Sequence, residues 1–144
     1  MKNEDIKLSN QLCHPLYSAA NALVRVYGPI LEGIDLTYPQ YIVMMALWEK
    51  DGVNLKTLSE ATFFDSGSLT PLIKRLMDKG LIKYTSAPED QRQKIIYLTK
   101  KGEKLSLEAG KIPELMMCQL QLTMNEFITL KNLTEKLRRN LNQS

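Results

Sequence analysis

Cys13 is the first residue in the chain whose side chain could do redox chemistry, and it stands beside the only histidine, His14. The thiolate is the form of cysteine that reacts with peroxides, and it needs access and surroundings that favour negative charge. The stretch NQLCHPLYSAA lies where an amphipathic helix begins, and the unpaired N–H groups of a first helical turn stabilise an anion. From this stretch alone, a buried and inert cysteine is the simpler interpretation.

The second cysteine, Cys118, lies in PELMMCQLQ, where packing within a helix is an equally simple role. The start of the chain lacks the apolar segment of a signal peptide, and no run reaches the length of a membrane span. We therefore expect a cytoplasmic protein without a membrane partner, in which a structural disulfide is not expected. One histidine and two scattered cysteines do not form the ligand cluster of a zinc site, and we expect neither a metal nor a cofactor.

Positive charge is concentrated in the middle of the chain. The 144 residues carry a net charge of +3, and their composition is typical of a globular domain. Residues 66–104 hold nine Lys or Arg and four Asp or Glu, so this segment is +5 and the remainder is −2. Such a segment suggests a phosphate backbone as its partner, with a solvated basic face as the alternative.

Hydrophobic periodicity predicts a mostly helical protein. Apolar residues recur every three or four positions over 8–27, in a helix that we expect to end at Gly28-Pro29. Thr37 and Gln40 have the spacing of a capping box, and the run YIVMMALW that follows is apolar on all sides. These features predict a central buried helix.

Two short helices are expected next, over 54–62 and 65–80, followed by β-rich segments over 81–86 and 93–99. The polar stretch APEDQR joins the two β segments as the turn of a hairpin. Asp65 is placed to cap the second helix, whose apolar residues face inward. The pattern predicts a mainly α fold with a small β-hairpin wing, a winged helix-turn-helix that binds DNA. Its outward face carries Ser66, Ser68, Thr70, Lys74 and Arg75.

The remaining chain divides into two helices. One follows Thr99 to about Gln121 with disturbances at Gly110 and Pro113, and the other starts at the capping box of 123–126. A long apolar stripe exceeds what the winged core needs, so we infer that these helices pack between two chains; packing within one chain is the alternative. The whole chain is then one domain, with the winged helix at about 36–100 and dimerisation helices at about 5–30 and 101–144. The stripe consists of Leu120, Met124, Phe127, Leu130, Leu133, Leu137 and Leu141.

The segments DSGSLTPLIKRLMDKGLI and PEDQRQKIIYLTKKG resemble the MarR family of bacterial transcription regulators, and Asp90-Gln91-Arg92 matches the D-x-R of the family's wing. NQLCHPLYSA, Tyr27 and LTYPQYIVMMALWE resemble its organic-hydroperoxide-responsive branch, the OhrR type. The resemblance covers almost the whole chain. It implies a homodimeric repressor of pseudo-palindromic, double-stranded operator DNA, which releases the DNA when an organic hydroperoxide oxidises its N-terminal cysteine.

This resemblance also implies roles for individual residues. Cys13 falls on the peroxide-sensing cysteine, and Tyr27 and Tyr38 fall on two tyrosines that hydrogen-bond its sulfur. Arg92 falls on the arginine that enters the minor groove, and Asp90 on the carboxylate that orients it. The outward residues of the second short helix would contact the DNA.

Cys118 lies in the region where two-cysteine members of the branch carry a resolving cysteine. The resemblance leaves open a Cys13–Cys118 disulfide between subunits or a mixed disulfide with a small thiol. The sequence departs from the branch at His14-Pro15, because proline removes a backbone donor and disfavours helical geometry at the residue before it. We therefore expect the first helix to begin near Pro15 or to kink there, with His14 a bystander or cap rather than an aid to the thiolate.

The sequence is also compatible with two other functions. One is a MarR-type regulator that responds to a small phenolic ligand and uses its cysteines only for packing. The other is a thiol peroxidase, which is less favoured because no base with an orienting partner is evident near Cys13. We accordingly expect a regulator and not an enzyme.

Overall fold

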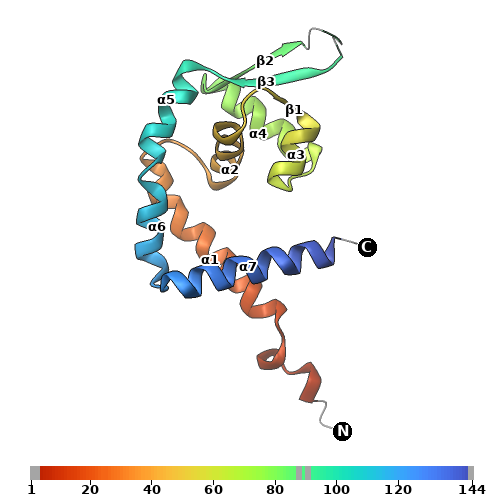
Figure 1. The fold of residues 1–144 in the computed structure, drawn as a ribbon, viewed down its shortest axis with the longest axis vertical. Coiled ribbons are helices and arrows are strands. Elements are labelled where there is room, and N and C mark those ends of the chain that lie inside the picture. Colours follow the sequence, from red (N-terminus) through yellow and green to blue (C-terminus); the bar gives the residue numbers. More distant parts are fainter. Residues whose placement is uncertain (1–3, 87–88, 90–91, 143–144) are drawn as a thin grey trace. The chain divides into compact units, whose positions relative to one another are not determined.

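The computed structural model describes residues 4–86, 89 and 92–142, and it divides into two compact units, Met1–Lys111 and Ile112–Ser144. Within the described residues, no helix has both the length and the apolar character that crossing a bilayer requires. The first unit contains the 3-10 turns Glu4–Ile6 and Leu8–Asn10, then α1 (Cys13–Glu32), α2 (Tyr38–Glu49), β1 (Val53–Asn54), α3 (Leu55–Thr62), α4 (Ser66–Asp78), β2 (Ile82–Ser86), β3 (Lys94–Leu98) and α5 (Lys100–Ala109) (Figure 1). The second contains α6 (Ile112–Leu120) and α7 (Met124–Leu141).

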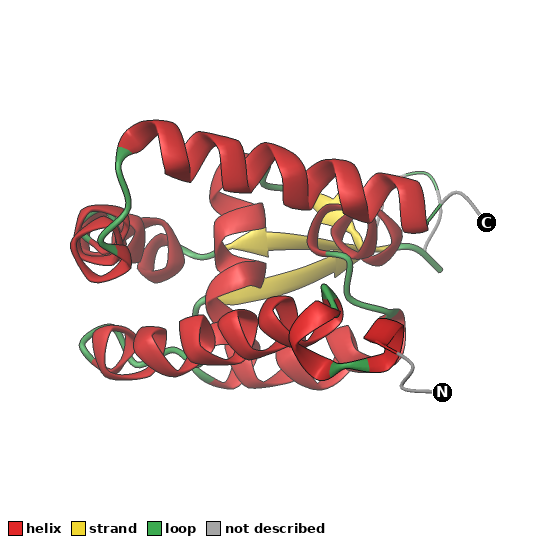
Figure 2. Ribbon diagram, turned by 90° about the horizontal axis from the view of Figure 1, so that it is seen from below, coloured by secondary structure: helices red, strands yellow, loops and turns green. Residues whose placement is uncertain are grey.

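The strands, drawn in yellow in Figure 2, form one antiparallel sheet. Their order in this sheet is β1-β3-β2. The hairpin predicted for the wing is confirmed, with Tyr84 of β2 opposite Ile96 of β3. The sequence did not predict β1, because two residues are too short to show a period of two. Val53 pairs with Ile96 from the other side, so Ile96 lies in the middle of the sheet and is fully buried.

Helix α2 forms the centre of the first unit and packs against α1, α3, α4 and α5. Its residues Val43, Met44 and Leu47 are completely buried, as expected for a helix that is apolar on all sides. The predicted capping box is present: Thr37 N donates to Gln40 Oε1 over 3.1 Å, and Gln40 N donates to Thr37 Oγ1 over 3.4 Å. This cap fixes where α2 begins and therefore where Tyr38 lies.

Helix α1 differs from the prediction at both ends. It begins at Cys13, and Pro15 is accommodated as the third residue because first-turn N–H groups have no helical acceptor. It also continues past Gly28-Pro29 to Glu32, so the expected end at residue 28 was wrong. Pro29 removes only one hydrogen bond, and the helix is held beyond it by the buried side chain of Leu31.

The turn between α3 and α4 is held by side-chain hydrogen bonds. Ser59 Oγ donates to the Phe64 carbonyl over 2.6 Å, and Phe64 N donates to Thr62 Oγ1 over 3.3 Å. Phe63 adopts a left-handed conformation with φ 59°, which reverses the chain after α3. These contacts set the angle at which α4 leaves the turn.

Helix α5 is fastened to the winged helix at its first turn. Trp48 Nε1 donates to the Gly102 carbonyl over 2.9 Å, and Thr99 Oγ1 donates to the Gly80 carbonyl over 2.6 Å. A Cβ on Gly102 would lie 2.1 Å from the Leu81 carbonyl oxygen, so only glycine permits this approach. The wing, α2 and the start of α5 are thereby connected as one body.

The expected break after α5 and the expected cap of α7 are both present. Helix α5 ends at Ala109 and α6 begins at Ile112, so the disturbance predicted at Gly110 is confirmed. Thr123 and Glu126 form the predicted capping box of α7. Helix α7 has no buried residue, and its exposed apolar side chains include Met124, Ile128, Leu130, Leu133 and Leu141.

Candidate DNA interface and thiol site

Helix α4 presents the five polar residues expected to contact DNA. Leu69, Ile73 and Leu76 are fully buried and anchor one side of the helix, which leaves the opposite side to solvent. Asp65 caps the helix by accepting from Ser68 N over 2.7 Å, and this hydrogen bond holds the pKa of the Asp65 carboxyl below its ordinary value. The five residues Ser66, Ser68, Thr70, Lys74 and Arg75 are all exposed.

The geometry of α4 also limits what one of these residues can do. Thr70 Oγ1 donates to the Ser66 carbonyl over 2.9 Å, so its proton is used within the helix. Its oxygen remains able to accept a hydrogen bond from a donor group such as a base amino group. Lys74 lies four residues further along, on the same face as Thr70.

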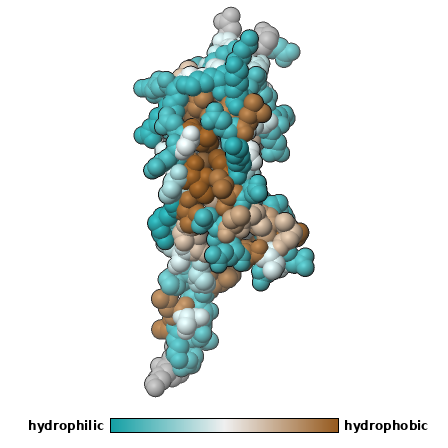
Figure 3. Space-filling model, turned by 90° about the vertical axis from the view of Figure 1, so that its left-hand side faces the viewer, coloured by the Kyte–Doolittle hydropathy of each residue, from teal (hydrophilic) through white to brown (hydrophobic). Residues whose placement is uncertain are grey.

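The wing carries further positive charge. Arg92 is exposed at the start of the returning arm, whereas its expected partner Asp90 lies outside the described residues. Lys94 begins β3, and its Nζ lies 5.2 Å from the centre of the Tyr84 ring, within cation–π distance. The end of the molecule that carries the wing is mainly hydrophilic in the space-filling view (Figure 3).

Cys13 and Tyr27 do not meet within one chain. Both lie on α1, fourteen residues apart. At a rise of 1.5 Å per residue, that spacing separates them by about 21 Å along the helix axis. The Cys13 side chain is exposed in the first turn of the helix. The expected hydrogen bond from Tyr27 to this sulfur therefore needs a second chain.

The two expected tyrosines do lie together. The ring centroids of Tyr27 and Tyr38 are 5.0 Å apart, and Tyr41 joins them at 5.9 Å from Tyr27. Burial raises the pKa of Tyr27, with a further increase from Tyr41 and Tyr38, and burial alone raises the pKa of Tyr38. Both phenols therefore stay protonated at neutral pH and can donate a hydrogen bond to an anion.

The remaining thiol-site candidates are also placed by the structure. Cys118 lies on α6 in the second unit, and its side chain is exposed rather than packed in a core. His14 is exposed, and at the second position of α1 its backbone is helical despite the proline that follows.

Sequence reasoning missed two lysines near the wing. Lys56 and Lys94 line one pocket together with Arg92, although they lie on different elements. No local motif marks them; only the unpredicted pairing of β1 with β3 brings the start of α3 beside the wing.

A helix-turn-helix whose outward face is polar and basic, backed by a β-hairpin, defines the winged-helix class of DNA-binding proteins. The family described as transcriptional regulator SarA/Rot matches residues 25–108. The chain belongs to this group of MarR-type winged-helix transcriptional regulators.

Two individual regulators with similar sequences support the assignment to this family. The chain is 39% identical to the organic hydroperoxide resistance transcriptional regulator of Bacillus subtilis over 78% of its own length and 76% of the relative's. It is 35% identical to the regulator SarZ of Staphylococcus saprophyticus, over 91% of this chain and 90% of that one. These relatives are transcriptional regulators rather than enzymes.

Solved structures of one regulator, AbfR of Staphylococcus epidermidis, are similar as well. The reduced, DNA-bound form matches with a TM-score of 0.82 and 30% identity, covering 99% of this chain and 97% of that chain. AbfR has also been solved overoxidised on DNA and in a disulfide form, which match with TM-scores of 0.77 and 0.65.

Proposed function

We propose that the protein is a dimeric repressor that binds operator DNA and releases it when an organic hydroperoxide oxidises Cys13. The observation that supports this most directly is the exposed Cys13 thiol in the first turn of α1. The Bacillus relative is a regulator of organic hydroperoxide resistance, and AbfR has reduced, overoxidised and disulfide forms. Release on binding a phenolic ligand is not favoured by these relatives.

In this proposal, residues from two chains form each thiol site. Since α1 separates Cys13 from Tyr27 within a chain, the sulfur meets Tyr27 and Tyr38 of the partner subunit. The two phenols, protonated at neutral pH, would donate charge-assisted hydrogen bonds to the thiolate. A dimer is therefore required for sensing as well as for reading two half-sites of DNA.

Exposed apolar side chains supply the surfaces for such a dimer. Leu12 and Leu16 lie on either side of Cys13 in the sequence and are 67% and 36% exposed. Helix α7 exposes its own apolar residues along its length. Isolated surface leucines are ordinary, but a whole helix without a buried residue is typical of an element that packs on another chain. The leucines beside Cys13 would also suit the apolar body of an organic hydroperoxide.

The chemistry has two steps. The Cys13 thiolate attacks the hydroperoxide, an S–O bond forms as the O–O bond breaks, and the alkoxide takes up a proton to leave as an alcohol. Sulfur is thereby oxidised to the sulfenic acid, and the peroxide is reduced. The thiol of Cys118 from the partner then attacks this sulfur, which forms a disulfide and releases water. The exposure of both thiols is consistent with this second step, and a small external thiol could replace Cys118 in it.

Oxidation would act on DNA binding through geometry. A disulfide ties the start of α1 to α6 of the other chain, and the winged helices of both chains turn relative to each other. Because the wing, α2 and α5 are connected through Gly102, each winged helix would turn as a rigid body. The two winged helices would then no longer match the spacing of the two half-sites of the operator.

A gel-shift experiment with operator DNA tests the proposal. Cumene hydroperoxide should release DNA from the wild-type protein and from neither Cys13→Ser nor Cys13→Ala. Release that persists in Cys13→Ser would rule out the sensing role. A non-reducing gel should show a dimer band after oxidation, absent in Cys118→Ser; a band that survives this variant would exclude Cys118 as the resolving thiol.

A further inference from the structure

Lys79 joins the end of α4 to the turn between α1 and α2, and the function proposed above gives it no role. It is the C-cap residue of α4, and its side chain is only 27% exposed although it carries an ammonium group. Its Nζ donates to the backbone carbonyl of Asp35 and, over 3.3 Å, to Oε1 of Gln40. The Asp35 carboxylate lies 3.4 Å from the same nitrogen. A partly buried ammonium group needs such acceptors, and these acceptors fix where the side chain lies.

The acceptor Gln40 belongs to the cap that positions Tyr38. Its side chain is buried, and the same Oε1 atom also accepts from Thr37 N over 3.1 Å. Tyr38 follows Thr37 as the first residue of α2, and its ring centroid lies 5.0 Å from that of Tyr27. One amide oxygen therefore receives hydrogen bonds both from the residue before Tyr38 and from the end of α4.

The turn that receives Lys79 is closely attached to α1. Leu36 N donates to the carbonyl of Leu31 over 3.2 Å, and Leu31 is fully buried. Between these two residues, Asp35 adopts a left-handed conformation with φ 53°. Because α1 is continuous from Cys13 to this turn, a movement of its start is carried to the Asp35 carbonyl that Lys79 holds.

The backbone after α4 is attached in the other direction, to α5. The Lys79 carbonyl accepts from Lys101 Nζ over 2.8 Å, and the next carbonyl, that of Gly80, accepts from Thr99 Oγ1 over 2.6 Å. Helix α4 itself packs against α2, α3 and β2. The end of α4 is therefore a junction that the Lys79 side chain extends to the turn between α1 and α2.

We propose that Lys79 is a positioning residue that couples the thiol site to α4, so that the turn between α1 and α2 and the DNA-contacting helix move together when Cys13 is oxidised. The inference rests on the proposed function, in which oxidation displaces the start of α1. Coupling between distant sites requires an element whose arrangement both sites bias. With Lys79 in place, a displacement of α1 and of the start of α2 moves α4. Without it, the turn of residues 33–37 can absorb part of the displacement.

The quantity that measures this coupling is the ratio of the operator Kd of the oxidised protein to that of the reduced protein. Coupled sites typically change each other's affinity by about 5- to 150-fold. Methionine has a similar length to lysine but donates no hydrogen bond, so Lys79→Met keeps much of the packing and removes the connection. We expect this variant to reduce the ratio by about fivefold or more.

The reaction of Cys13 itself should be unaffected. Lys79 bonds to the carbonyl of Asp35 and the amide of Gln40 and not to the phenol groups of the thiol site. The rate of sulfenic acid formation with cumene hydroperoxide should therefore stay at the wild-type value in Lys79→Met. Lys79→Arg should restore the ratio, because a guanidinium group keeps the charge and can donate to two acceptors at once.

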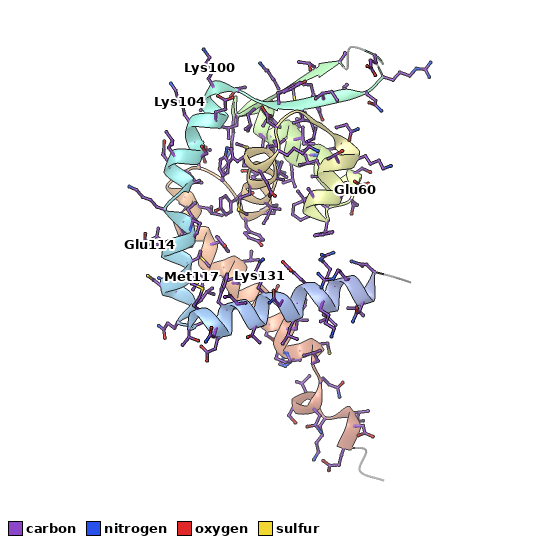
Figure 4. All side chains as sticks on the ribbon, in the orientation of Figure 1. Glu60, Lys100, Lys104, Glu114, Met117 and Lys131 are labelled. Carbon is purple, nitrogen blue, oxygen red and sulfur yellow. The ribbon has the colours of Figure 1, made fainter. Side chains whose placement is uncertain are left out.

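The test is a fluorescence-anisotropy titration of operator DNA with the full chain, before and after treatment with cumene hydroperoxide. Lys104→Met is the matched control, because it removes the same charge from an exposed side chain on α5 that points outward (Figure 4). This control should keep the wild-type ratio. Circular dichroism melts establish that each variant is folded.

A ratio in folded Lys79→Met that equals the wild-type ratio would overturn the proposal, even if both affinities fall, because equal losses mean a purely structural role. Gln40→Met breaks the same connection from the other side, and it replaces Lys79→Met if that variant does not fold. If the wild-type protein keeps its DNA after oxidation, the proposed function fails together with this inference. Release from wild type with an unchanged ratio in the variant rejects only the role of Lys79.

Discussion

Cys13 and Tyr27 lie on one continuous helix, and their separation of fourteen positions places the thiol and the phenol on different turns that cannot approach each other. Helix α1 acts as a fixed spacer of about 21 Å, since an α-helix rises 1.5 Å per residue. Tyr38 lies with Tyr27 and not with the cysteine, at a centroid distance of 5.0 Å. A thiol held by these tyrosines must therefore come from a partner chain.

Mixed dimers provide a direct test of this arrangement. A Cys13→Ser subunit paired with a Tyr27→Phe subunit regenerates one complete site only if the site spans two chains. We expect its single Cys13 to react with cumene hydroperoxide at the wild-type rate per thiol, measured by labelling of the sulfenic acid.

The matched control carries both substitutions on one subunit and pairs it with a wild-type subunit. Its only Cys13 faces a phenylalanine across the interface, and the loss of a charge-assisted hydrogen bond of about 1.5 kcal/mol should slow it about tenfold. Equal rates in the two mixed dimers would mean that Tyr27 does not contact the thiol across the interface.

Gly102→Ala should destabilise the winged helix. The new methyl carbon would lie 2.1 Å from the Leu81 carbonyl oxygen, and the backbone fixes the positions of both atoms. We expect a loss of about 3 kcal/mol in the free energy of unfolding, at the upper end of ordinary overpacking. Urea denaturation measures it.

Gly28→Ala is the control for that substitution. Apart from the adjacent residues and the helix's own backbone, no atom of the described residues lies within 4 Å of the position its Cβ would take. In the interior of α1 the alanine should stabilise the chain by about 0.5–1 kcal/mol through its helix propensity. A Gly102→Ala protein as stable as wild type would show that α5 can shift away from the wing.

Asp65 should make the stability depend on pH at the acidic end. Hydrogen bonding to Ser68 lowers the pKa of this carboxyl below 3.8 in the folded state. A carboxyl with a lowered folded pKa contributes stability above its unfolded pKa, and that contribution is lost as the pH falls through the folded value. Asparagine keeps the capping oxygen but does not titrate. The melting temperature of Asp65→Asn should therefore decrease less than that of the wild type when the pH is lowered from 6 to 2.5.

The control for Asp65 is Glu60→Gln, which removes one negative charge from the neighbouring helix α3, where the side chain is exposed (Figure 4). It should follow the wild-type pH dependence. If the melting temperatures of Asp65→Asn and the wild type decrease by the same amount over this pH range, the cap does not contribute to acid unfolding.

Arg92→Ala should weaken operator binding while the fold is retained. The side chain is exposed at the wing, so its removal creates no cavity. Loss of a groove contact should cost about 1–3 kcal/mol, which is roughly a 5- to 150-fold loss in affinity at physiological salt. Anisotropy measures the affinity, and a wild-type value with an unchanged melting curve would show the wing assignment to be wrong.

Much of the fold follows from local sequence. The period of the apolar residues predicted α2 and α4, the capping boxes at Thr37 and Thr123 marked helix starts, and β-branched residues marked the wing. Each of these signals depends on residues close together in the chain. For the same reason α1 was predicted to end at Gly28-Pro29, because packing of Leu31 is not visible in a local pattern.

The sequence by itself determined the chemistry that is present: a cysteine at a helix start, two tyrosines, and a basic recognition face. Only the tertiary structure decided which groups can meet. It brings Tyr27 beside Tyr38, keeps both away from Cys13 of the same chain, and gathers Lys56 and Lys94 around one pocket. Distances along a helix are fixed by its rise, whereas contacts between elements depend on how the sheet and helices pack.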